Sequence, residues 1–364
     1  MGITEQDVQR AVATVIDPNT GHDFVSSQGL KNVQVTGSSD VAFDIELGYP
    51  ARSQVPALRQ ALIEAVRALP GAGNVSVNIT SVIQALTAQR GMLPLPQVKN
   101  IIAVASGKGG VGKSTTAVNL ALALAAEGAR VGVLDADIYG PSQPLMLGLS
   151  GRPESRDGKT MDPLVAYELQ VNSIGFMVTP DQAMIWRGPM ATQALEQLLR
   201  LTNWSNLDYM VVDLPPGTGD IQLSLSQRVP LSGAVIVTTP QDVALADARK
   251  AVSMFEKVGV PILGLVENMA VHVCSNCGHR EHIFGADGGK RYAEEKGIDY
   301  LGALPLALAI REQTDSGRPT VVAEPDGEVA ATYRQIARQM AVKIAGRARD
   351  FSGKLPTITV SHDT

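Results

Sequence analysis

The sequence predicts an α/β protein in two parts, a small α+β domain in front of a larger domain built on a doubly wound, mostly parallel sheet. The length of 364 residues is more than one domain usually needs. Apolar and polar residues alternate in several segments within residues 1–89, which is typical of half-buried strands. From residue 100 onward the strand-like segments are apolar throughout, as in parallel sheets that helices cover on both faces.

The front domain is expected over residues 1–89. Its helices are predicted from apolar residues at helical spacing, and its strands from strict alternation. Asp17–Gly21 has the composition of a turn and ends the first helix. In chain order, the predicted elements are a helix at Glu5–Val15, strands at Val33–Val35 and Val41–Leu47, a helix at Val55–Leu69 and a strand at Val75–Ile79.

Residues 90–99 are predicted to be a linker, because Arg90–Gln97 contains two prolines and a glycine. The large domain is expected over residues 100–350, followed by a C-terminal tail at 351–364. Its predicted strands are short and rich in β-branched residues, and helices separate them. The strands are Ile101–Ala105, Val131–Leu134, Tyr209–Val212, Ala234–Val237 and Ile262–Val266, and the helices are Thr115–Glu127, Met190–Leu201, Asp242–Val258 and Glu328–Arg347.

The composition excludes several classes of protein. Apolar residues make up 45% of the chain and charged residues 18%, which argues against intrinsic disorder. The net charge of −5 and the aromatic content of 4% give no basic field and no stacking surface, so we expect no nucleic-acid partner. The N-terminus lacks the pattern of a signal peptide and no apolar run could span a bilayer, so we expect no membrane partner and a cytoplasmic location.

A phosphate-binding loop follows the first apolar strand. Gly107, four further residues, then Gly112, Lys113 and Ser114 satisfy the P-loop pattern, and a predicted helix begins directly after it. Glycines allow successive backbone N–H groups to face phosphate oxygens, and the helix N-terminus adds its positive dipole end. We therefore expect Lys113 to contact the terminal phosphates of a nucleotide and the Ser114 hydroxyl to hold Mg²⁺.

Acidic residues follow two of the predicted strands. Asp135 and Asp137 come after the strand at Val131–Leu134, and Asp213 ends the strand at Tyr209–Val212. The carboxyl ends of parallel strands form the ligand crevice of such a sheet. Asp213 is predicted to bind magnesium through a water molecule, and Asp137 to orient the water that attacks the terminal phosphate. The alternative is that these carboxylates only cap helices and form turns.

Lys108 distinguishes this loop from an ordinary P-loop. Gly107–Thr115 resembles the deviant P-loop of the dimerising ATPases that act in chromosome partition, septum placement and nitrogenase reduction. The resemblance implies a homodimer that binds ATP, with Lys108 reaching the partner's phosphates and Asp137 as the water-positioning acid. Asn268 resembles the asparagine that contacts adenine. The implied nucleotide-binding residues are Gly107, Lys108, Gly109, Gly110, Val111, Gly112, Lys113, Ser114, Thr115 and Asn268.

Cys274 and Cys277 are the only two cysteines and form a C-x-x-C pair. Such a pair is found in redox sites, in zinc sites and in iron–sulfur sites. His279 and His282 follow closely and could complete a zinc site, although their spacing is cramped for one tetrahedral centre. Two thiolates from each chain of a symmetric dimer would supply the four ligands of a [4Fe–4S] cluster. His22 and His272 have no predicted role.

Taken together, the deviant P-loop, Asp135–Ser142, Trp186–Met190, Asp213–Asp220 and the late cysteine pair resemble the Mrp/ApbC family of iron–sulfur cluster carriers. The resemblance implies an ATP-hydrolysing homodimer that holds a labile [4Fe–4S] cluster on Cys274 and Cys277 of both chains. Its implied partners are apo iron–sulfur proteins and cluster-assembly scaffold proteins. Residues 4–85 resemble the small iron–sulfur assembly domain that many bacterial members carry in front, although this copy has no cysteine.

Two other functions are compatible with a deviant P-loop. A spatial-organising ATPase needs a basic DNA face or an amphipathic terminal helix, and the tail with Pro356 makes a poor membrane helix. An electron-donating reductase of the nitrogenase type would need two widely separated cysteines. Trp186 and Arg187 are interpreted as packing and surface residues. Basic residues on the last predicted helix are interpreted as a solvated face; they are Arg334, Arg338, Lys343, Arg347 and Arg349.

Overall fold

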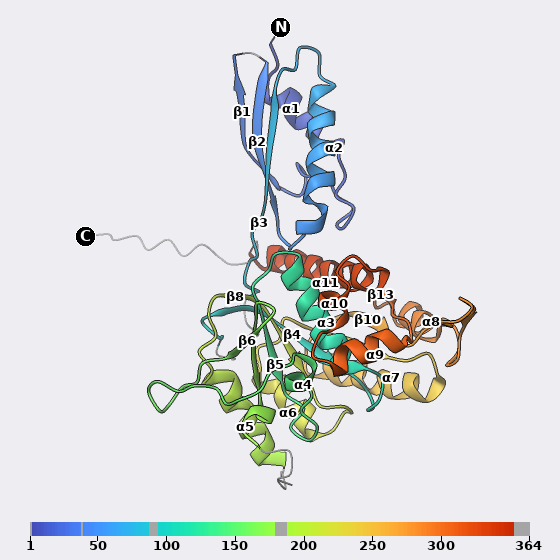
Figure 1. Cartoon of the computed structure of the whole chain (residues 1–364). Helices are drawn as coiled ribbons and strands as arrows, with labels where there is room; N and C mark the ends of the chain where they lie inside the picture. The colour runs from blue at the N-terminus through green and yellow to red at the C-terminus, as the bar shows by residue number, and fades with distance from the viewer. Residues whose placement is uncertain (1, 38, 87–93, 179–187, 353–364) are drawn as a thin grey trace.

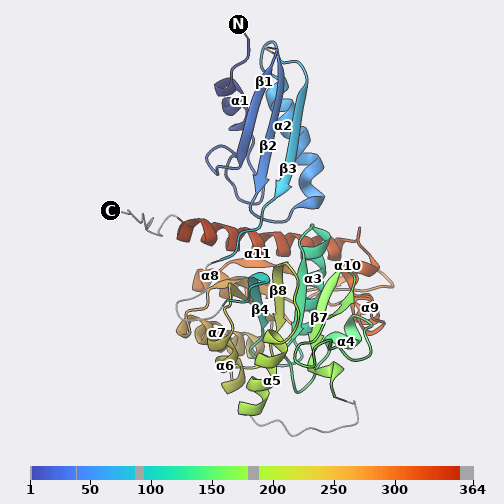
Figure 2. The same cartoon turned by 90° about the vertical axis from the view of Figure 1, so that its left-hand side faces the viewer.

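The computed structural model describes residues 2–37, 39–86, 94–178 and 188–352. In this part of the chain the two domains lie on opposite sides of the long helix α11 (Glu328–Ser352), as Figures 1 and 2 show. None of the described helices is both long and apolar enough to cross a membrane.

The front domain is a three-stranded sheet with two helices packed against it. Strand β2 is antiparallel to β1 and parallel to β3, in the order β1-β2-β3. Thr4 and Asp7 form a capping box that begins the first helix, and alternate side chains of β2 are buried as the sequence predicts. The elements are α1 (Glu5–Val12), β1 (Leu30–Thr36), β2 (Asp40–Leu47), the 3₁₀ turn η1 (Arg52–Gln54), α2 (Val55–Arg67) and β3 (Val75–Ser81).

The large domain contains an eight-stranded sheet in the order β13-β10-β9-β4-β8-β5-β7-β6. All neighbours are parallel except β6 and β7 at one edge, which confirms the predicted mostly parallel sheet. Its strands are β4 (Val98–Ala105), β5 (Val131–Asp135), β6 (Leu164–Ala166), β7 (Leu169–Ser173), β8 (Leu207–Asp213), β9 (Gly233–Thr238), β10 (Ile262–Glu267) and β13 (Tyr300–Ala303).

Helices cover both faces of this sheet, and each face has its own core. Alternate residues of β4 enter the two cores: Ile102 and Val104 face α3 and α11, whereas Ile101 and Ala103 face α5, α6 and α7. The core around α3 and α11 is continuous with the core of the front domain. The helices are α3 (Lys113–Ala126), α4 (Gln143–Met146), η2 (Ile174–Phe176), α5 (Gly188–Arg200), α6 (Asp220–Arg228), α7 (Asp242–Lys257), α8 (Gly288–Lys296), α9 (Leu308–Asp315) and α10 (Thr320–Ala323).

Two predicted boundaries fall inside regular elements. Strand β4 begins at Val98 and pairs there with Leu207, so it occupies the last two residues of the predicted 90–99 linker. Helix α11 ends at Ser352 and so includes the first two residues of the predicted tail. The rest of that tail lies outside the described residues, as do Trp186 and Arg187.

The two domains are joined by a buried polar contact at the C-terminal end of α3. The Glu127 carboxylate accepts hydrogen bonds from the Ser53 backbone N–H at 2.9 Å and the Ser53 hydroxyl at 2.6 Å. The Arg338 guanidinium of α11 forms an ion pair with the same carboxylate at 2.5 Å. The interpretation of Arg338 as part of a solvated face is therefore wrong: its helix face is covered by the front domain.

Candidate functional site

The P-loop occupies the turn between β4 and α3, as its sequence predicts. Gly112 has a φ of +80° and immediately precedes the helix, a conformation that favours glycine. A Cβ at Gly107 would lie 2.1 Å from the backbone carbonyl of Asp247 on α7. Both glycines are therefore required by local geometry, one by its backbone angle and the other by close packing.

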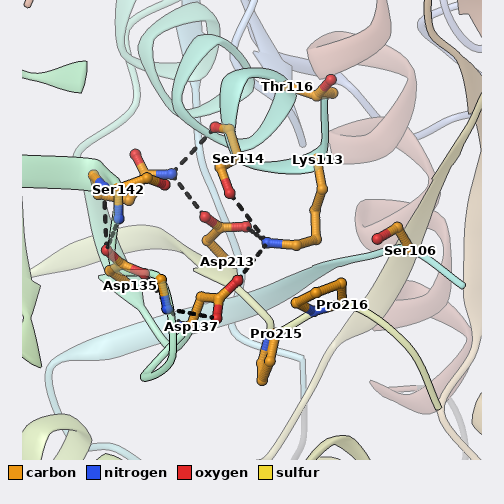
Figure 3. Close-up of polar contacts among 12 residues, drawn as sticks. Ser106, Lys113, Ser114, Thr116, Asp135, Asp137, Ser142, Asp213, Pro215 and Pro216 are labelled. Atoms are coloured by element: carbon orange, nitrogen blue, oxygen red, sulfur yellow. Dashed lines mark hydrogen bonds and ion pairs between the residues drawn. The ribbon is translucent and has the colours of Figure 1, made fainter. Parts of the chain in front are cut away.

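Lys113 points into a cluster of buried acids at the carboxyl ends of β5 and β8 (Figure 3). Its ammonium forms a short ion pair with Asp213, lies 3.1 Å from the Ser114 hydroxyl and lies 3.9 Å from Asp137. The predicted phosphate, magnesium and water-positioning residues thus come together from three separate segments. In this arrangement the Lys113 ammonium offsets part of the negative charge of Asp213 and Asp137.

Two carboxyl groups of this cluster have raised pKa values. Burial, with the nearby charge of Asp213, raises the pKa of Asp135 to about 7. Burial also raises the pKa of Asp137, while the Lys113 ammonium acts in the opposite direction. Asp135 accepts hydrogen bonds from the backbone N–H groups of Ser142 at 3.0 Å and Gln143 at 3.1 Å. Asp135 therefore fixes the loop that carries Asp137, which supports a capping role for this one acid.

Gln143 is a site residue that the sequence reasoning missed. Its side-chain amide donates to Asp213 at 2.9 Å and to the Ser114 backbone carbonyl at 3.1 Å, and the residue is fully buried. Its Oε1 atom has no hydrogen-bonding partner among the described residues. The only sequence signal was its position, directly after the motif that ends at Ser142.

Among the described residues, Lys108 forms no ion pair with the acidic cluster. The side chain is partly exposed, and in the described part of the chain no carboxylate lies within ion-pair distance of its ammonium. The Ser106 hydroxyl donates to the Lys108 backbone carbonyl at 2.8 Å and so braces the loop. The predicted contact of Lys108 with the phosphates of a partner chain stays a prediction.

Asn268 packs directly on the P-loop. Its side-chain amide donates to the Val111 carbonyl at 2.9 Å, and the backbone N–H of Asn268 donates to Thr238 at 2.8 Å. A Cβ at Gly112 would lie 2.1 Å from the same amide. The structure thus places Asn268 directly after β10 and against the P-loop. Its contact with adenine stays a prediction.

The two cysteines lie in a small hairpin formed by β11 (His272–Val273) and β12 (Arg280–Glu281). The turn is held by two backbone hydrogen bonds: the Cys274 N–H donates to the His279 carbonyl at 2.9 Å, and the Gly278 N–H donates to the Cys274 carbonyl at 2.8 Å. Both thiols are free, and Cys277 is exposed. The N–H groups of Asn276 and Cys277, with the Cys277 thiol, lower the pKa of Cys274 and favour its thiolate.

The hairpin does not bring a third ligand to the thiols. Within the described residues, no three His, Cys, Asp or Glu side chains are arranged to hold a metal ion. The Nδ1 atom of His282 is instead 2.8 Å from the Ala270 carbonyl. The geometry therefore gives no support to zinc bound within one chain by the cysteine pair, His279 and His282.

A parallel sheet with a glycine-rich loop before α3, and with acids at the ends of β5 and β8, defines a P-loop NTPase. Solved structures agree with this class. A nucleotide-binding protein from Archaeoglobus fulgidus in complex with ADP matches at 36% identity with a TM-score of 0.56, covering 64% of this chain and 91% of its own. The cell-division ATPase MinD from Pyrococcus furiosus matches at 22% identity with a TM-score of 0.51, covering 67% of this chain and 99% of its own. At this identity the match supports a shared fold and nothing more.

The chain belongs to the family of NUBPL iron-transfer P-loop NTPases, whose model matches residues 97–341. A second family model, described as iron–sulfur cluster assembly protein, matches residues 5–79. The iron–sulfur cluster carrier protein of Escherichia coli K12 is 48% identical over 96% of this chain and 94% of its own length. The mouse iron–sulfur cluster transfer protein NUBPL is 54% identical over 68% and 78%. These matches confirm the predicted resemblance to iron–sulfur cluster carriers.

Proposed function

We propose that this protein is a cytoplasmic ATP-hydrolysing carrier that holds a labile [4Fe–4S] cluster between two copies of the chain and transfers it to apo-proteins. The hairpin of Cys274 and Cys277 carries this proposal. It presents two free thiols, one of them exposed, and one chain offers no further ligand among its described residues. A second chain related by a two-fold axis would bring the four thiolates that a [4Fe–4S] cluster needs.

The surroundings of the hairpin support a shared site. Val273 and Ile283, which flank the cysteine turn, and Leu308, near the base of the hairpin, are 39%, 51% and 59% exposed. Exposed apolar side chains beside the two cysteines are typical of a surface that a second protein chain covers. The relatives named as iron–sulfur carrier or transfer proteins agree with this cargo.

Replacing both cysteines tests the proposal. Wild-type protein reconstituted anaerobically should bind about four irons per two chains, with broad visible absorbance and a dimeric mass. The Cys274→Ala/Cys277→Ala variant has no thiol left and should bind none. Ser275→Ala, between the two cysteines, is the matched control and should keep the wild-type iron content. One zinc per chain, or an iron content that the double variant retains, would contradict the proposal.

Magnesium fits the acidic cluster. Hydroxyl and carboxylate oxygens are the ligands it prefers, and Ser114 and Asp213 offer them beside Lys113. The unpartnered Gln143 Oε1 adds a buried acceptor at the same place, suited to a magnesium-bound water. When bound, the ion would neutralise charge on the ATP phosphates, while Asp137 would orient the attacking water and Lys113 would contact the terminal phosphates.

Magnesium should therefore strengthen the effect of nucleotide on stability. With ADP at about 100 times its dissociation constant, binding should stabilise the protein by about 2.7 kcal/mol and raise its melting temperature. A chelator should reduce this rise, because the acids then face the phosphates without a divalent cation. In Asp213→Asn the difference with and without magnesium should disappear. Equal melting shifts with Mg²⁺ and with chelator in wild type would contradict this assignment.

A further inference from the structure

The near arm of the cysteine hairpin continues the segment that follows β10, and the first residue of this segment contacts the P-loop. Asn268 contacts the P-loop, and Ala270 two residues later donates its N–H to Leu304 at 3.0 Å. The Leu306 N–H then donates to Val271 at 2.9 Å. The chain from Asn268 to the first hairpin strand is thus bonded to the segment that follows β13.

Two histidines extend this attachment to both arms. His272 places its Nδ1 atom 3.0 Å from the Leu306 carbonyl, and His282 places its Nδ1 atom 2.8 Å from the Ala270 carbonyl. A carbonyl oxygen can only accept, so each Nδ1 must carry the hydrogen. The rings therefore act as donors to the main chain, with the tautomer fixed by these contacts.

The hairpin needs such support. Each of its strands has two residues, and a two-stranded hairpin is marginal by itself in water. His282 lies just beyond the second strand, so its bond to Ala270 closes the base of the hairpin across from the first strand. The cysteine turn projects from this closed base.

We propose that His282, assisted by His272, is a positioning residue that holds the cysteine hairpin on the segment that follows β10. This inference rests on the proposed function for its biological meaning, since the hairpin is the site where the cluster would bind. The carbonyl that His282 contacts belongs to Ala270, two residues after Asn268, so the closed base is connected by a short segment to the residue that contacts the P-loop. Metal sites commonly include side chains that do not touch the metal but orient the residues that bind it.

Amide substitutions separate positioning from metal ligation. The side-chain nitrogen of asparagine can replace Nδ1 as a donor to the Ala270 carbonyl, whereas alanine has no donor. Neither asparagine nor alanine would replace an imidazole that binds metal through Nε2. Rescue by asparagine is therefore expected only for a positioning role. His279 lies in the same hairpin, and its ring has no hydrogen-bonding partner in the described part of the chain, so His279→Ala is the matched control.

The first measurement uses the full-length, anaerobically reconstituted dimer and follows cluster loss to a ferrous chelator. His282→Ala should lose the cluster about 2 to 10 times faster than wild type, the range expected for one hydrogen bond. His282→Asn and His279→Ala should stay close to the wild-type rate. Wild-type behaviour of His282→Ala, failure of asparagine to rescue, or equal acceleration by His279→Ala would overturn the proposal.

The second measurement needs no cluster, so it separates this inference from the proposed function. Amide hydrogen exchange in the metal-free protein should be about 2 to 10 times faster at Cys274 and Gly278 in His282→Ala than in wild type. Asparagine at position 282 should restore the slow exchange. Unchanged exchange in His282→Ala would overturn the positioning role, whereas a wild type that binds no cluster but shows this pattern would overturn only the carrier function.

Discussion

Mixing two inactive variants, Lys108→Ala and Asp137→Ala, should restore ATP hydrolysis to about a quarter of the wild-type rate if two chains share each nucleotide site. Each variant alone should lose at least about 100-fold in rate, because each lacks a group that acts on the developing charge or on the attacking water. The measurement is phosphate release after equilibration of the mixed chains.

The expected recovery follows from which chain supplies each group. In a mixed dimer, one site has Asp137 and Lys113 of the first chain and Lys108 of the second, so that site is complete. The other site lacks both groups. Random pairing makes about half of the dimers mixed, and each mixed dimer has one working site of two.

Lys108 is partly exposed and, within the part of the chain that the structure describes, forms no ion pair with the acidic cluster of its own chain, which is the structural reason to expect this result. Mixing Asp137→Ala with Lys113→Ala is the control. Both of those groups belong to the same chain's site, so the mixture should stay inactive. No recovery in the first mixture would show that Lys108 acts within its own chain. Recovery in the control would show instead that Asp137 and Lys113 act from different chains.

Replacing Glu127 should lower the free energy of unfolding more than any other substitution proposed for this protein. Glu127→Ala leaves the Arg338 guanidinium buried without its carboxylate partner, and removing one member of a buried ion pair typically costs about 3–5 kcal/mol. It also removes the acceptor for the Ser53 N–H in η1. The measurement is urea unfolding followed by circular dichroism, in which the front domain should separate into an earlier transition.

Two further variants show whether the charge or the packing matters. Glu127→Gln keeps oxygen and nitrogen in place of the carboxylate and should lose less stability than alanine. Replacing the pair together, as Glu127→Leu/Arg338→Met, should be less damaging than the sum of the single changes, because no unpaired charge stays buried. A loss below about 1 kcal/mol in Glu127→Ala would indicate an exposed pair instead.

The accuracy of the sequence-based predictions depended on how local each signal was. Gly112 meets a requirement of its own backbone, so the motif alone is enough to place it at the start of a helix. Apolar strands such as Ile262–Val266 were found because burial on both faces leaves a continuous pattern. Helices α6 and α8 are short and polar on average, which left no apolar period to detect.

The acids and the cysteine pair form an intermediate case. Their positions at strand ends and in a C-x-x-C motif indicated a site, but sequence position alone could not assign a role to each residue. Asp135 turned out to bond the loop of Ser142 and Gln143, whereas Asp137 faces Lys113. Sequence spacing allowed His282 as a zinc ligand, and only the fold shows its Nδ1 bound to the Ala270 carbonyl.

The sequence by itself determined the parallel sheet, the P-loop that precedes α3 and the order of the two domains, because these follow from local backbone requirements and from the spacing of apolar residues. Tertiary structure alone decided which polar groups are partners. Glu127 meets Ser53 across 74 residues and Arg338 across 211, and neither separation leaves a pattern along the chain. A buried charge is strongly destabilising without a partner of opposite charge, but only the tertiary structure shows which residue that partner is.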